Sequence, residues 1–169
     1  VKEKNRILIR LINKDAVLVE QLHFRLIEHP EIDLKIREDA VTESINKLKR
    51  YKAIKSKELL TLQRSYFAQI SHHKRITADK VGEVRLAVLL ILKFISYYPF
   101  VFNKHDLKFN EKLNEFNLKK MVMLLKNLKG IHEDYRIEFV EDINIILDFF
   151  YNGIHSDMAK TLGLPCEIE

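Results

Sequence analysis

The segment ADKVGEVRLAVLLILKFISYY, residues 78–98, decides the fold. Every residue between Leu86 and Leu92 is apolar, so a helix built from this segment presents apolar side chains on all sides at about 100° per residue. Such a helix is stable in water only when other elements surround it. We therefore expect it at the centre of the fold, with Thr77 as its N-cap and Pro99 ending it.

Helical periodicity dominates the rest of the chain as well, and no strand-like alternation competes with it. Together with 78–98, the predicted set comprises seven main helices and a short C-terminal turn; the other ranges are 3–13, 15–28, 33–52, 57–73, 111–129 and 133–152, with the turn at 157–163. Asp15, Ser56 and Asn110 are the expected N-caps of three of these helices. Only four glycines and three prolines occur in 169 residues, which suits long helices. The sequence predicts a single all-α domain spanning residues 1–169.

The spacing of apolar residues assigns a buried face to two of the helices. In helix 57–73 this face holds Leu59, Leu62, Gln63, Tyr66 and Ile70, and His73 continues it while His72 points outward. In helix 133–152 it holds Tyr135, Phe139, Ile143, Ile146 and Phe150. Gly82 is a glycine inside a predicted helix, and we expect a neighbouring helix to approach closely there.

Two arrangements of these helices fit the sequence. Helices of about 20 residues joined by short loops form an antiparallel bundle, here around the apolar helix 78–98. Stacked helix pairs form a HEAT-like superhelix instead, although no self-similarity at a fixed period is visible. The sequence leaves both open.

Charge is distributed unevenly along the chain, whose net charge is +5. Residues 44–80 contain ten Lys and Arg against Glu58 and Asp79, a net charge of +8. Residues 131–169 contain Arg136 and Lys160 against nine acids, a net charge of −7. This asymmetry favours binding to a charged partner, or head-to-tail or antiparallel self-association.

The basic region contains KLKRYKAIKSK, residues 47–57, with six cations. Lys49 and Arg50 fan out around a helix, as a solvated face does. Lys57, Arg64 and Arg75 instead fall within about 20° of one another on the wheel of one helix, provided that it extends to Arg75. This row is the candidate site for a polyanion or an acidic partner, with Lys49 and Arg50 at its edge. Solvation or intramolecular pairing explains the same cations without a ligand.

An aromatic-rich stretch, FISYYPFVF at residues 94–102, follows the apolar segment. Tyr97, Tyr98, Phe100 and Phe102 are the candidate apolar patch for a partner. The alternative is a loop whose aromatic rings cover the end of the core, and exposure distinguishes the two.

Motifs with specific chemistry are lacking. EQLH, residues 20–23, has no second Glu-x-x-His pair to complete a di-iron site, so we predict no metal and no cofactor. No nucleophile elbow or phosphate-binding glycine loop occurs, and we expect no enzyme. Cys166, the single cysteine, excludes an internal disulfide and favours a reducing compartment.

Membrane and export signals are also lacking. The longest apolar run, LAVLLIL, is far shorter than the roughly 20 residues that span a bilayer. No apolar region follows the basic start of the sequence, so we expect no secretory signal and a cytoplasmic protein. The sequence opens on Val1 rather than Met and leaves open whether residues precede it.

These observations favour an intracellular, non-catalytic helical binding or scaffold domain. A protein partner or self-association is the expected interaction, and a membrane is not. The competing hypothesis is nucleic-acid binding through the basic surface of residues 44–80, whose affinity would fall steeply with salt.

Overall fold

The computed structural model describes residues 2–12, 14–50, 54–103 and 107–169, and every regular element in these ranges is a helix. The all-α prediction is therefore confirmed for this part of the chain. The elements are α1 (Lys2–Ile12), α2 (Ala16–Leu26), α3 (Pro30–Asn46), the 3-10 helix η1 (Lys47–Arg50), α4 (Ser56–Thr77), α5 (Lys80–Tyr97), α6 (Pro99–Phe102), α7 (Leu107–Lys129), α8 (Glu133–Tyr151) and α9 (Ser156–Thr161). The predicted set lacks α6, which is too short to show a periodic pattern. The predicted helix 33–52 included Lys47–Arg50, which form the 3-10 helix η1 after α3 ends at Asn46.

The apolar segment forms α5, which packs against α3, α4, α6, α7 and α8. Its side chains are buried around its circumference: Val84, Leu86, Ala87, Val88, Leu90, Ile91, Phe94 and Ile95. Burying a Leu, Ile or Phe side chain fully stabilises the fold by about 1.5–3 kcal/mol relative to leaving it exposed. Much of the apolar core therefore depends on contacts made by this one helix.

The turn between α4 and α5 has a different structure from the one predicted. Ala78 ends α4 in the left-handed region at φ 60°. Asp79, rather than Thr77, is the N-cap of α5, and its Oδ1 accepts a hydrogen bond of 2.9 Å from the Gly82 N–H. A Cβ at Gly82 would lie 1.9 Å from Asp79 Oδ2, so the glycine makes room for this cap and not for a neighbouring helix.

Two other predicted N-caps have opposite outcomes. Asp15 caps α2, because its Oδ1 accepts hydrogen bonds of 3.0 and 3.1 Å from the N–H groups of Val17 and Leu18. Asn110 lies inside α7, which begins earlier than predicted, at Leu107. Its buried amide donates to the Val101 carbonyl and accepts from Asn114 at 2.6 Å, so it connects α6 to α7 instead of capping a helix.

A buried pair of amides joins α4 to α7. Gln63 Nε2 donates to Asn117 Oδ1 at 3.0 Å, and Asn117 Nδ2 donates to Gln63 Oε1 at 2.8 Å. Both side chains are 0% exposed. Because each amide satisfies the other, this polar contact fixes the alignment of the two helices without leaving an unpaired group in the core.

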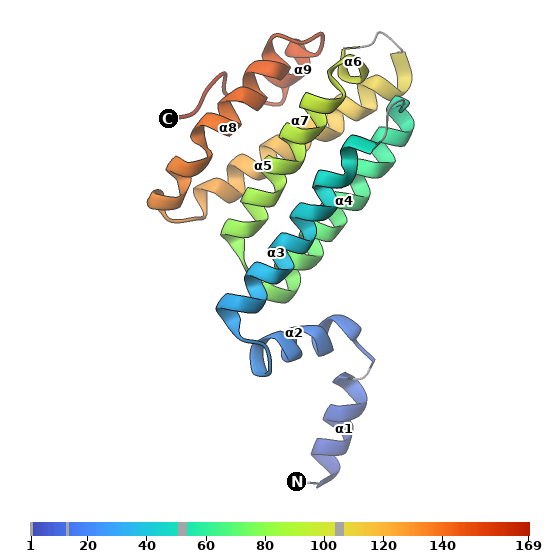
Figure 1. Ribbon diagram of the computed structural model, residues 1–169, viewed down its shortest axis with the longest axis vertical. Helices are drawn as coiled ribbons and strands as arrows, with labels where there is room; N and C mark the ends of the chain where they lie inside the picture. Colours follow the sequence, from blue (N-terminus) through green and yellow to red (C-terminus); the bar gives the residue numbers. More distant parts are fainter. Residues whose placement is uncertain (1, 13, 51–53, 104–106) are drawn as a thin grey trace.

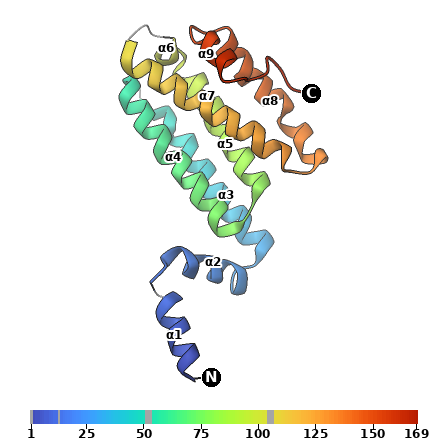
Figure 2. The same cartoon turned by 180° about the vertical axis from the view of Figure 1, so that it is seen from behind.

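The helices divide into a packed body and a projecting segment (Figure 1). Helices α3 to α9 lie close together, α2 crosses beneath them, and α1 extends away from them. The view from behind shows the same arrangement (Figure 2). We call α1 and α2 together the N-terminal arm.

Candidate functional site

The predicted basic row lies on α4, which extends to Thr77 and therefore includes Arg75. The side chains of Lys57, Arg64 and Arg75 are exposed. Within the described residues, no carboxylate lies within 4 Å of any of the three, so these cations are available to an anion. For Lys49 and Arg50, the structure gives the backbone in η1, and their side chains lie outside what it describes.

Aromatic rings of α7 support two cations of this row. Lys57 Nζ lies 5.8 Å from the centroid of the Phe109 ring, and the Arg64 guanidinium lies 5.6 Å from that of Phe116. Lys120 Nζ, also on α7, lies 5.5 Å from the Phe116 centroid. Such contacts contribute about 0.5–1 kcal/mol at exposed sites and hold the charged groups in place.

Lys120 is the most enclosed cation of this surface. Its ammonium lies 4.7 Å from the centroid of the Phe67 ring, on α4. Burial lowers the pKa of Lys120, and the negative charge of Glu83 opposes this effect. We call Lys57, Arg64, Lys120, Phe109 and Phe116 the α4–α7 cation–aromatic surface. A helical wheel of α4 alone does not show that α7 contributes to this surface. The sequence does contain one signal for it: Phe109, Phe116 and Lys120 lie within about 40° of one another on the wheel of α7.

The four aromatic residues of the predicted apolar patch do not gather at the surface. Tyr98 is 7% exposed and donates a hydrogen bond of 2.7 Å to the Leu48 carbonyl. Phe102 is 1% exposed and packs edge-on against two phenylalanines of α8. Tyr97 is half-buried, and Phe100 alone of the four is fully exposed, at 87%. Tyr98 and Phe102 are therefore core residues.

An ion-pair cluster fastens α2 to the body. Arg37 on α3 donates to Glu28 at 2.6 and 3.0 Å and to Glu20 at 3.0 Å. Glu20 also lies 2.9 Å from Nε2 of His72 on α4. The hydrogen bond from Arg37 lowers the pKa of Glu28 to about 2, against the effect of desolvation and with help from His23. The base of the arm is thus fixed by charge-assisted hydrogen bonds.

The outer part of the arm is apolar and exposed. No described residue of α1 is buried, and the exposed fractions of Ile7, Leu8, Ile9 and Leu11 are 51–58%. Phe24 is the only residue of α2 that is buried, and Leu26 is 77% exposed. α1 contacts α2, but this contact leaves the apolar surface uncovered.

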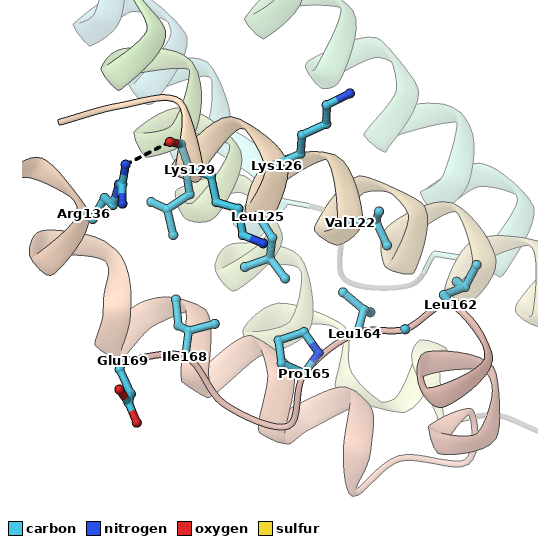
Figure 3. Close-up of a pocket in the computed structure, with 12 residues that line it drawn as sticks. Val122, Leu125, Lys126, Lys129, Arg136, Leu162, Leu164, Pro165, Ile168 and Glu169 are labelled. Carbon is cyan, nitrogen blue, oxygen red and sulfur yellow. Dashed lines mark hydrogen bonds between the residues drawn. The ribbon is translucent and has the colours of Figure 1, made fainter. Parts of the chain in front are cut away.

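A cavity of about 560 Å³ lies between α7 and the segment after α9 (Figure 3). Its apolar lining consists of Val122, Leu125, Leu128, Leu162, Leu164, Pro165 and Ile168. Arg136 lies at one end, where it donates to the carbonyls of Lys129 at 2.8 Å and Ile131 at 2.9 Å. Lys126 points away from the cavity in this view. Because Arg136 already donates to two carbonyls, its guanidinium is not free to fix a ligand in the cavity.

Metal-binding side chains do not converge in the described part of the chain. There, no set of three or more His, Cys, Asp or Glu side chains is placed to hold a metal ion. His73 is 4% exposed, and its Nε2 lies 3.5 Å from Asp79 Oδ2, a loose contact inside the α4–α5 turn. None of the described helices combines the length and apolarity needed to cross a membrane.

No family model, curated protein or solved structure matches the chain. A functional hypothesis therefore depends on two surfaces, the N-terminal arm and the α4–α7 cation–aromatic surface.

Proposed function

We propose that the protein is an intracellular helical binding domain that engages another protein through its N-terminal arm. The observation that carries this proposal is the exposure of α1, in which four large aliphatic side chains are each more than half exposed and no described residue is buried. Contiguous exposed apolar surface on a protein marks interaction sites.

The isolation of α1 strengthens the proposal. Most of the stability of a helix in a protein comes from packing of its amphipathic face against other elements. α1 obtains no buried contact from the body. Its helical form is therefore stabilised by a surface that another molecule supplies, in the manner of an amphipathic helix laid in a groove.

The attachment of α2 suits this role. Arg37, Glu20 and Glu28 hold α2 against α3, and Gln21 Nε2 donates to the Arg75 carbonyl at 2.7 Å. The base of the arm is thus rigid, while its outer helix is free to dock. A rigid base lowers the entropy that is lost when α1 binds.

Site-specific photo-crosslinking tests this function. A photoreactive amino acid at position 8 is expected to yield discrete protein adducts in cells, and the substitutions Ile7→Asp and Leu11→Asp are expected to abolish them. Position 100 is the matched control, because Phe100 is 87% exposed but lies outside the arm. Equal adducts from positions 8 and 100, or adducts that survive both substitutions, would refute the proposal.

In the same proposal, the body that carries the arm is a helical bundle. Repeats of a superhelix contact only their neighbours. α5 instead packs against five other helices, α3 and α8 among them. This pattern supports a bundle around α5 over stacked helix pairs.

The α4–α7 cation–aromatic surface favours nucleic-acid binding as a second candidate function. Among the described residues no carboxylate lies within 4 Å of its cations, and Phe109 is 39% exposed beside Lys57. Aromatic rings between cations suit single-stranded nucleic acid, in which bases stack and phosphates pair with Lys and Arg.

A fluorescence titration with single-stranded RNA and DNA at two salt concentrations tests the second candidate. Binding that weakens steeply with salt and is lost in Lys57→Glu/Arg64→Glu/Arg75→Glu would support it. The control Lys35→Glu/Lys129→Glu/Lys160→Glu changes the net charge equally on other surfaces and is expected to bind like the wild type. No binding at low salt, or equal loss in both triple variants, would eliminate this candidate.

A further inference from the structure

The acidic outer face of α8 has the chemistry that the N-terminal arm requires. We propose that α1 of one molecule docks on this face of a second copy of the chain, so that the protein associates head to tail. The inference rests on the proposed binding function of the arm and identifies its partner.

The two sides of α1 differ in chemistry. At about 100° per residue, Ile7, Leu8, Leu11 and Ile12 share one side of the helix, and Arg6 and Arg10 lie next to the edge formed by Ile7 and Leu11. The helix contains four cations and the single acid Glu3, so its net charge is +3. A surface that covers α1 must therefore combine apolar contact with negative charge.

The outer face of α8 provides both. Ile137 is 75% exposed and Ile145 is 50% exposed, although most large aliphatic side chains of this helix are buried. The acids that surround them on the exposed side are Asp134, Glu138, Glu141 and Asp148. Glu141 lies between Ile137 and Ile145, about 6 Å along the helix from each, so this face alternates apolar and acidic side chains.

The acids of this face are only partly neutralised. Asp134 lies 3.2 Å from Nδ1 of His132. Arg136, the one cation of α8, donates to the carbonyls of Lys129 and Ile131 at the other side of the helix. Glu138 shares Arg85 with Glu38, at 3.5 and 3.0 Å respectively. No cation lies within 4 Å of Glu141 or Asp148 in the described ranges. Arg6 and Arg10 have the opposite charge and are equally unpaired among those residues.

Docking within one molecule is excluded by the fold. α1 and α8 lie at opposite ends of the molecule in both views (Figures 1 and 2), and α2, which connects α1 to the body, is held by Arg37. The α8 face that α1 reaches therefore belongs to another copy.

Other occupants explain less of the structure. Pairing between two copies of α1 would bring Arg6 and Arg10 of both molecules together and leave Ile137 and Ile145 exposed. An anionic membrane would suit α1 but would repel the acids of α8, and it gives no reason for the exposed isoleucines. Docking of α1 on α8 covers the exposed apolar side chains of both helices. It also brings the unpaired arginines of α1 to the unpaired acids of α8.

Because the two surfaces are different, the contact is heterologous and generates chains or closed rings. A single helix on a helix face buries less than the roughly 1,200 Å² of a standard interface, so we expect weak association that depends on concentration and weakens with salt.

A complementation experiment by sedimentation velocity tests the inference. Variant A carries Leu8→Asp/Leu11→Asp and variant B carries Ile137→Asp/Ile145→Asp; all four side chains are at least half exposed, so both variants are expected to fold. Each variant alone is expected to be monomeric where the wild type associates. Their equimolar mixture is expected to form a 1:1 dimer and nothing larger, because only the α1 of B and the α8 face of A remain functional. A control with Phe100→Asp and Met123→Asp, both exposed, is expected to associate like the wild type.

Charge reversal sharpens the test. Arg6→Glu/Arg10→Glu is expected to weaken association at least tenfold, and Glu141→Lys/Asp148→Lys is expected to do the same. The quadruple variant Arg6→Glu/Arg10→Glu/Glu141→Lys/Asp148→Lys, in which every α1–α8 contact has both charges reversed, is expected to regain more than half of the lost affinity.

Three results would overturn the inference. They are a wild type that stays monomeric at every concentration, variants A and B that associate as the wild type does, and a mixture of A and B that stays monomeric. A monomeric wild type that binds phosphatidylglycerol vesicles through α1 would assign the arm to a membrane surface instead. If association fails while position 8 still cross-links to another protein, the proposed function stands and only this choice of partner falls. If both fail, the arm is not a binding element.

Discussion

At the scale of single residues, the α4–α5 turn shows how one glycine permits one cap. The Asp79 carboxylate occupies the space that a Cβ at position 82 would take, and it accepts the Gly82 N–H. It also lies 3.5 Å from the buried His73. The burial of Asp79 raises the pKa of its carboxyl, but the contacts with His73 and the Gly82 N–H outweigh this effect, so the pKa is lowered overall.

Gly82→Ala is expected to destabilise the protein, because alanine displaces the capping carboxylate and loss of a cap costs about 0.5–2 kcal/mol. In an Asp79→Ala background the same substitution is expected to be stabilising, since alanine favours a helix over glycine by up to about 1 kcal/mol. Urea unfolding of the four proteins measures this difference. Equal effects of Gly82→Ala in both backgrounds would show that the glycine serves another contact.

The titration of Glu28 tests the attachment of the arm. Its pKa is lowered from the ordinary value of a glutamate to about 2 in the folded protein, chiefly by the hydrogen bond from Arg37. A depressed pKa means that the contact contributes stability above the unfolded pKa, which is lost as the pH falls toward 2. Carbon-detected NMR is expected to show this low pKa in the wild type and a pKa near the ordinary value in Arg37→Gln. A Glu28 that titrates identically in both proteins would contradict the proposed attachment.

At the scale of elements, sequence periodicity predicted the buried face of each helix better than it predicted where the helix begins and which residue caps it. Leu59, Gln63, Tyr66 and Ile70 of α4 are buried as predicted, and His73 is buried while His72 is exposed. Tyr135 is the exception on α8, where it is 46% exposed in the first turn.

Helix ends depend on tertiary contacts that a sequence window does not contain. Asn110 precedes a periodic segment and resembles an N-cap, yet the Val101 carbonyl accepts its amide and α7 begins at Leu107. The cation–aromatic surface shows the same limit, since Phe116 and Arg64 meet only after α4 and α7 have packed.

The amide pair between α4 and α7 predicts a non-additive effect. Gln63→Leu removes both hydrogen bonds to Asn117 and leaves a buried amide oxygen unpaired, at a cost of about 1–3 kcal/mol. The double substitution Gln63→Leu/Asn117→Leu is expected to cost less than the single one, because no buried polar group then lacks a partner. Thermal unfolding measures both, with Gln69→Leu on the exposed side of α4 as a near-neutral control. A double variant less stable than Gln63→Leu alone would contradict this account.

At the scale of the whole molecule, the chain combines a body of packed helices with an arm whose outer helix shares none of their core. Composition and periodicity were sufficient to predict the all-α class and the apolar character of α5. They did not predict the arm, because Ile7 and Leu11 have the spacing of an ordinary core-facing helix. Which surface covers them depends on how α2 crosses the body and on contacts such as Arg37 with Glu28.

Hydrogen exchange tests this division directly. In dilute, monomeric protein the amides of α1 are expected to exchange at nearly the unfolded rate, while those of α5 exchange only through global unfolding. Raising the protein concentration is expected to slow exchange in α1 and at the outer face of α8 together. Strong protection of α1 in the dilute monomer would contradict its isolation from the body.

The absence of buried side chains in α1 also affects how the protein can evolve. Most substitutions are rejected during evolution because they lower the stability of the fold, but those in α1 cost the body almost nothing. Under the proposed binding function, selection on this helix therefore acts on recognition of the partner and hardly at all on folding. α5 is under the opposite constraint, since nearly every change in it disturbs several neighbours. The chain can acquire or exchange a binding specificity at its N-terminal helix without a compensating mutation in the body.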